Sequence, residues 1–95
     1  MIIVRVHFLF NLRSIVGEKE VLLKLENGST IKDLMRLLIR QYGEKLEKSL
    51  RIKDGKSDLS ITILVNGRNI DFIKGFETPL FNGDVVSIVP PAGGG

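Results

Sequence analysis

The 95 residues suffice for one domain, and 43% hydrophobic with 26% charged side chains is typical of a soluble globular protein and excludes a disordered chain. The chain has no cysteine, which excludes disulfides, thiolate metal sites and a cysteine nucleophile, and so small a domain has little stability to spare for a catalytic cavity. The 14 basic side chains are interspersed with 11 acidic ones, and this net charge of +3 without a basic stripe argues against a nucleic-acid partner. We therefore expect a protein that is not an enzyme.

Two strands are predicted at the amino-terminal end. From Ile2 to Phe10 every second residue is apolar, which is the period of a strand with one hydrophobic face. In the run 21–25, Val21, Leu23 and Leu25 share one face of a second strand. The polar stretch around Gly17 and Glu18 allows this strand to fold back on the first as a hairpin.

An amphipathic helix is predicted after this hairpin. Apolar side chains from Ile31 to Tyr42 recur at the spacing of one helical stripe, and Thr30 is a suitable cap with Asp33 three residues later. Gly43 is a natural end for the helix, and the apolar spacing of residues 46–50 indicates a further turn or two.

The second half of the chain predicts three more strands. Residues 53–58 are polar and are expected to form a surface loop, and the β-branched run 60–65 is expected to form a strand. Asn66-Gly67 is a strong hairpin signal, with residues 68–72 as the return strand. The last strand is predicted over residues 84–89.

These elements predict an α+β fold in which one helix covers one face of a sheet. A single apolar helical stripe is buried most simply against one apolar sheet face. The first and last strands are apolar on both faces over part of their length, so we place them side by side in the centre. The expected architecture is the β-grasp, or ubiquitin-like, fold: a mixed sheet of about five strands and one main helix, with a domain over residues 1–89 and a tail over 90–95.

The tail predicts a chemical role for the carboxyl terminus. Two prolines end the last strand, and the four residues after them reach at most about 13 Å, enough to enter a narrow slot on another protein. Glycine lets the backbone pass where a Cβ would collide. A carboxylate is ionised at neutral pH and reacts poorly until an oxygen becomes a leaving group, so a partner must supply ATP and magnesium. The alternative, a frayed end without a role, stays open.

Four segments of the chain form a recognisable series. They are residues 8–13 (FLFNLR) with Gly17, residues 64–67 (LVNG), residues 79–86 (PLFNGDVV) and residues 90–95 (PPAGGG). Taken in this order, they resemble the MoaD family, the small subunit of molybdopterin synthase, and the resemblance covers essentially the whole chain. The related sulfur carriers of thiamine synthesis and the archaeal ubiquitin-like small modifiers share the fold and the tail.

The resemblance implies a function for the last glycines. A ubiquitin-activating-type enzyme would adenylate Gly95, and a sulfur donor would convert it to a thiocarboxylate for the molybdenum-cofactor precursor held by the large subunit of molybdopterin synthase. Gly93 and Gly94 would thread the tail into these enzymes, and Gly93 stands where the family more often has serine, threonine or alanine. The alternative is a protein modifier that is joined through Gly95 to target lysines.

A partner surface is expected near the start of the tail. Leu9 and Val89 are out of phase with the core residues of their strands, and contiguous exposed apolar residues tend to be binding sites. We expect these two residues, together with Ile70, to contact the activating enzyme or the synthase; that they pack beneath a loop is the open alternative. One histidine without cysteine makes a poor metal site, so we assign no metal ligand and no cofactor bound by this chain. No apolar run approaches the roughly 20 residues that span a bilayer, so we expect no membrane segment and a cytoplasmic location.

Overall fold

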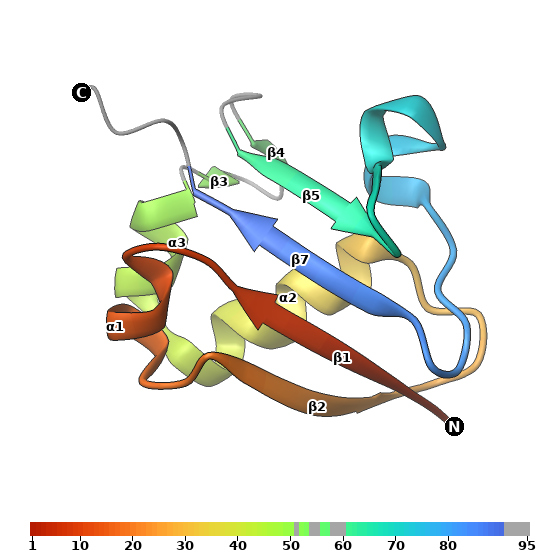
Figure 1. The fold of residues 1–95 in the computed structure, drawn as a ribbon, viewed down its shortest axis with the longest axis horizontal. Helices are drawn as coiled ribbons and strands as arrows, with labels where there is room; N and C mark the ends of the chain where they lie inside the picture. Colours follow the sequence, from red (N-terminus) through yellow and green to blue (C-terminus); the bar gives the residue numbers. More distant parts are fainter. Residues whose placement is uncertain (51, 54–55, 58–60, 91–95) are drawn as a thin grey trace.

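A five-stranded mixed sheet is the framework of the molecule (Figure 1). The computed structural model describes residues 1–50, 52–53, 56–57 and 61–90. The helices and strands, in chain order, are β1 (Ile2–Phe8), α1 (Leu12–Val16), β2 (Glu20–Leu25), α2 (Ile31–Tyr42), α3 (Glu44–Leu50), β3 (Ile52–Lys53), β4 (Lys56–Ser57), β5 (Thr62–Val65), β6 (Arg68–Asn69), the 3-10 helices η1 (Ile70–Phe72) and η2 (Gly75–Glu77), and β7 (Val85–Val89).

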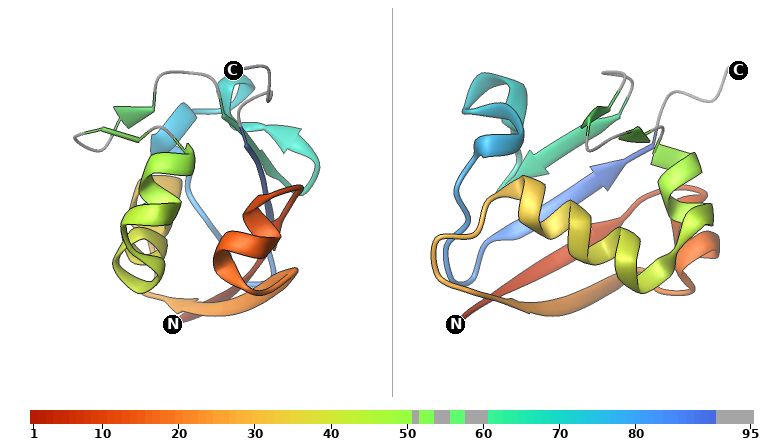
Figure 2. Two further views of the ribbon diagram at one scale, coloured as in Figure 1. Left: turned by 90° about the vertical axis from the view of Figure 1, so that its left-hand side faces the viewer. Right: turned by 180° about the vertical axis from the view of Figure 1, so that it is seen from behind.

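The order of the strands across the sheet is β2-β1-β7-β5-β6. The two central strands, β1 and β7, run parallel, with Phe8 opposite Ile88, and every other neighbouring pair is antiparallel. Helix α2 lies across one face of this sheet, as Figure 2 shows from behind. The first and last strands are therefore neighbours in the centre, and the expected β-grasp fold with one main helix is confirmed.

The core lies between the sheet and helix α2. Along β1 every second side chain is buried, as the alternation in the sequence predicts. The apolar stripe of α2 is buried against this face of the sheet, which removes it from water and holds the two layers together. The buried residues of these two elements are Ile2, Val4, Val6 and Phe8 from β1, and Ile31, Leu34, Met35 and Leu38 from α2. Even α2, with 12 residues the longest helix in the described ranges, is too short to cross a bilayer.

Helix α2 begins with the expected cap. The backbone N–H of Thr30 donates to Oδ2 of Asp33 at 2.9 Å, and the backbone N–H of Asp33 donates in return to the Thr30 hydroxyl oxygen at 3.5 Å. The bond from the Thr30 N–H is the main cause that lowers the pKa of the Asp33 carboxyl below its ordinary value of 3.8. The helix therefore starts at the residue that the sequence predicts.

This cap makes stability depend on pH in a defined direction. Because folding lowers the pKa of Asp33, its stabilising effect is complete above about pH 5 and is lost as the pH falls through 3.8 and then through the lower folded pKa. We expect Asp33→Asn to lower the free energy of unfolding by about 0.5–1 kcal/mol near neutral pH, and the difference from wild type to shrink at about pH 3. Urea denaturation at both pH values measures this, and a difference independent of pH would contradict it.

Three local predictions differ from the structure. The segment between β1 and β2 contains helix α1 instead of leading directly into a hairpin, since Leu12 packs into the core and Gly17 ends the helix at a φ of 84°. The return strand predicted over residues 68–72 is only the two residues of β6, because the Asn69 side chain accepts a hydrogen bond from the Asp71 N–H and starts η1. The predicted loop over residues 53–58 contains part of the short antiparallel pair β3 and β4.

Candidate functional site

The start of the tail is held at the end of the central strand β7. Ile88 pairs with Phe8 of β1 and with Ile63 of β5, and Val89 pairs with Thr62. Beyond it Pro90 has no N–H to donate, so the ladder of hydrogen bonds cannot continue in the same way. The predicted site residues Gly93, Gly94 and Gly95 lie outside the described residues, which end at 90.

Neighbouring elements frame this tail root, which we define as Ile88, Val89 and Pro90. Figure 1 shows the end of β7 on the same side of the molecule as α1 and α3, and far from the start of β1. The backbone N–H of Leu9 donates to the Ile88 carbonyl oxygen at 3.2 Å, which continues the pairing one residue past β1. The tail root is therefore anchored on both sides by strands, so its position is set by the core of the fold.

The predicted partner surface is brought together only in part. Leu9 and Val89 are half-buried and lie close together at the tail root, as expected from their place in neighbouring strands. Ile70 is 4% exposed and belongs to the hydrophobic core, so its assignment to a surface is wrong. The observed register, with Leu64 opposite Asn69, would place Ile70 opposite the core residue Ile63 if the strand continued, and the 3-10 helix η1 that starts at Ile70 likewise leaves it buried.

Phe10 is the surface residue that sequence reasoning missed. The alternation from Ile2 to Phe10 places Phe10 on the buried face, but β1 ends at Phe8 and Phe10 is 71% exposed. Its backbone adopts a φ of 54°, which reverses the chain direction before helix α1. The helical spacing of Leu12, Ile15 and Val16 was the available signal that the strand had to end earlier.

A small charged cluster lies on the sheet face away from α2. Glu20 forms an ion pair with Arg5, with Nε and Oε2 3.0 Å apart, and its other carboxylate oxygen lies 3.8 Å from Nε2 of His7. These side chains are about half exposed, so we assign the cluster to the solvated surface. Among the described residues no group of three or more acidic or histidine side chains could hold a metal ion.

Two shallow hollows lie at the end of the sheet opposite the tail root. One of about 470 Å³ lies beside Met1 and the loop from residue 26 to 29, and one of about 380 Å³ lies between Ile3, Leu22 and Val85. The first includes Met1, which precedes β1, and the second includes Val85, the first residue of β7, whereas the tail leaves from the end of β7. Neither hollow therefore offers a place where the tail root could be acted upon.

Comparison with known proteins identifies a family and several relatives of the chain. The ThiS family matches residues 6–95. Small archaeal modifier protein 3 of Haloferax volcanii is 34% identical over 88 residues, which are 93% of this chain and 94% of the relative. A protein of Archaeoglobus fulgidus provisionally named a sulfur carrier is 46% identical over 66 residues, 70% of this chain and 74% of the relative. The solution structure of small archaeal modifier protein 1 from Methanosarcina acetivorans matches with a TM-score of 0.80 and 34% sequence identity. The match covers 100% of this chain and 98% of the chain of that protein.

Proposed function

Because the chain belongs to the ThiS family, we propose that it is a sulfur carrier whose Gly95 carboxylate is adenylated and then converted to a thiocarboxylate. The proposal rests on one observation: the match to the family model extends through the tail to Gly95. The tail is therefore part of the sequence that the family has in common. The anchoring of the tail root by two strands supports it, because a rigid body can then present the tail to a partner.

The chemistry needs a partner at each step. A carboxylate oxygen of Gly95 attacks the α-phosphorus of ATP, which releases pyrophosphate and leaves an acyl-adenylate. The terminal sulfur of a donor persulfide then attacks the carbonyl carbon and displaces AMP, which gives an acyl disulfide. A second thiol of the donor attacks the donor's sulfur in that bond, forms a disulfide with it and releases the Gly95 thiocarboxylate. A ubiquitin-activating-type enzyme would hold ATP and Mg²⁺, and this chain contributes the terminal carboxylate alone.

The acceptor of the sulfur is the finer part of the proposal. We assign it to a precursor of molybdopterin held by the large subunit of molybdopterin synthase, on the resemblance of the segments 8–13, 64–67, 79–86 and 90–95 to the small subunit of that enzyme. The absence of cysteine is consistent with this role, since the sulfur travels on the terminal carbonyl and the carrier needs no thiol of its own.

A protein modifier is the second candidate. The observation in its favour is the 34% identity, over nearly the whole chain, to a protein named as a small archaeal modifier. In this role the amine of a target lysine attacks the activated Gly95 carbonyl carbon, AMP leaves, and an amide bond forms. Both roles begin with the same acyl-adenylate, so only the fate of the activated glycine distinguishes them.

Intact mass measurement tests which fate applies. The purified chain is incubated with the activating enzyme of the same organism, ATP, Mg²⁺ and a sulfur donor, first alone and then with cell extract. We expect the exchange of one oxygen for one sulfur in most of the chain, dependent on ATP. Heavier conjugates without the exchange would support the modifier instead. If neither the exchange nor a conjugate is detected, both roles are contradicted.

A further inference from the structure

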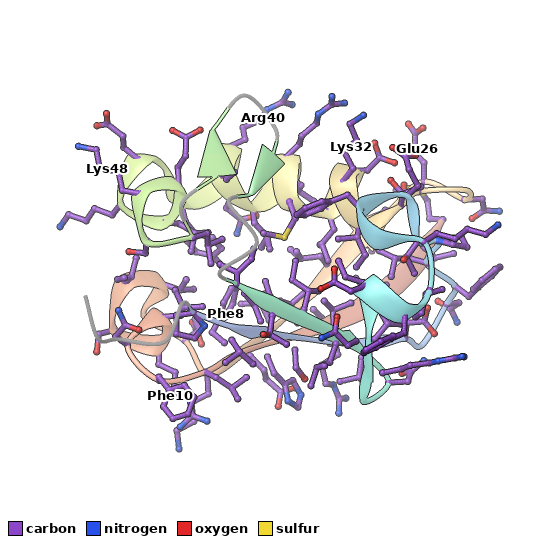
Figure 3. All side chains as sticks on the ribbon, turned by 90° about the horizontal axis from the view of Figure 1, so that it is seen from above. Phe8, Phe10, Glu26, Lys32, Arg40 and Lys48 are labelled. Atoms are coloured by element: carbon purple, nitrogen blue, oxygen red, sulfur yellow. The ribbon has the colours of Figure 1, made fainter. Side chains whose placement is uncertain are left out.

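Phe10 is an exposed aromatic residue in a backbone conformation that bulky side chains avoid. Its φ of 54° lies in the left-handed region, where a large residue is strained. Its side chain is 71% exposed, so the strain is not offset by burial in the core. Figure 3 shows Phe8 inside the molecule and Phe10 at its outer edge, on the side away from α2.

The fold requires the backbone conformation at position 10 but does not require phenylalanine there. The turn is held by hydrogen bonds from the Leu12 N–H to the Leu9 carbonyl oxygen and from the Arg13 N–H to the Phe10 carbonyl oxygen, both at 3.2 Å. At the other end of the same helix the chain needs a positive φ again, and there it has Gly17 at 84°. Glycine or asparagine would make the turn at position 10 with less strain, so the turn itself does not account for an aromatic side chain there.

Phe10 also lies beside the tail root. It follows Leu9, whose N–H donates to the Ile88 carbonyl oxygen at 3.2 Å, two residues before Pro90. The five residues from 91 to 95 span at most about 18 Å even when fully extended. Any protein that holds the Gly95 carboxylate in its active site must therefore approach the surface around Pro90, where Phe10, Leu9 and Val89 lie.

We propose that Phe10 is the aromatic anchor through which the chain binds the activating enzyme that adenylates Gly95; this inference rests on the proposed function. An exposed aromatic residue that fills a pocket of a partner is a common centre of binding energy. The half-buried Leu9 and Val89 extend the apolar surface around it. Phe10 thus lowers the stability of the free chain and strengthens the complex.

The test compares binding and stability for the same variants. We measure the dissociation constant for the activating enzyme by calorimetry, and the melting temperature of the free chain. Phe10→Ala and Phe10→Asn are expected to weaken binding about 30-fold, and Phe10→Tyr to bind within about threefold of wild type. Phe10→Asn is also expected to melt at or above the wild-type temperature, because asparagine tolerates the left-handed conformation.

Phe81→Ala is the matched control, because Phe81 is 65% exposed and precedes β7 at the end of the sheet opposite the tail. It is expected to bind the enzyme within about twofold of wild type. Equal losses for Phe81→Ala and Phe10→Ala would overturn the anchor, as would a fall of more than about 5 °C in the melting temperature of Phe10→Asn. A loss of affinity for the sulfur-accepting partner with unchanged affinity for the activating enzyme would likewise refute it.

The outcomes separate this inference from the proposed function. If the wild-type chain supports ATP–pyrophosphate exchange and the Phe10 variants bind as tightly as it does, only the anchor fails. If the wild-type chain neither binds the enzyme nor supports exchange, the proposed function fails and the anchor with it. A raised KM for the carrier with an unchanged kcat is the kinetic result expected of an anchor that does not touch the reacting atoms.

Discussion

Deletion of Gly94 and Gly95 is expected to abolish adenylation and to leave the fold intact. Among the described residues the buried core lies between Ile2 and Ile88 and the last residue paired in the sheet is Val89, so we expect the deletion to leave these contacts in place. It would move the carboxylate to Gly93, which shortens the reach of the tail by about 7 Å. Carrier-dependent ATP–pyrophosphate exchange measures the loss, which we expect to be at least 100-fold, and thermal melting followed by circular dichroism measures the fold.

Gly93→Ser is the matched control for the deletion. It changes the tail but keeps its length and both final glycines, and serine is among the residues more usual at this position in the family that the chain resembles. We expect it to support exchange within a fewfold of wild type. Unchanged adenylation after deletion of the two glycines would show that the tail is not the reacting group.

Phe8→Ala is expected to have the largest effect on stability. Phe8 is completely buried at the end of β1, and its ring meets that of Tyr42 edge to face, with the centroids 6.0 Å apart. Truncation would leave a cavity between the sheet and α2 and cost about 3–5 kcal/mol. Since a domain of this kind has only about 5–15 kcal/mol of stability, the variant is expected to lose much of it. Urea denaturation followed by circular dichroism measures the change.

Phe10→Ala is the matched control, two residues further along the chain. It removes the same side chain from an exposed position, so the free energy of unfolding is expected to change by less than about 1 kcal/mol. A similar loss in both variants would mean that Phe10 packs against the body of the protein. That result would refute the contrast in burial on which the proposed anchor depends.

Strong periodic patterns made most of the fold predictable. The alternation in β1 and the apolar stripe of α2 each follow from the local geometry of the backbone, and Asn66-Gly67 carries its own turn conformation, with Asn66 at a φ of 52°. Helix α1 was missed because its helical spacing extends over only five residues, which is a weak signal beside the longer alternation from Ile2 to Phe10. Its formation depends on the burial of Leu12, which is a tertiary contact.

Some residues of the candidate site could be predicted from the sequence, and others could not. The two prolines and three glycines could be named from the sequence, because their effects on the backbone are intrinsic to those residues. The exposure of Phe10 could not be predicted, because it depends on where β1 ends and α1 begins. The burial of Ile70 could have been predicted, because the register of the Asn66-Gly67 hairpin extends to place this residue opposite the core residue Ile63.

By itself the sequence determined the class of fold and the central place of the first and last strands, and it predicted the tail as the reacting end of the molecule. These properties depend on residue type and on spacing along the chain, which are local. Only the tertiary structure decided which apolar residues face water beside the tail root. The burial of a side chain depends on contacts between segments that are far apart in the sequence. The local pattern of residues along the chain does not specify those contacts.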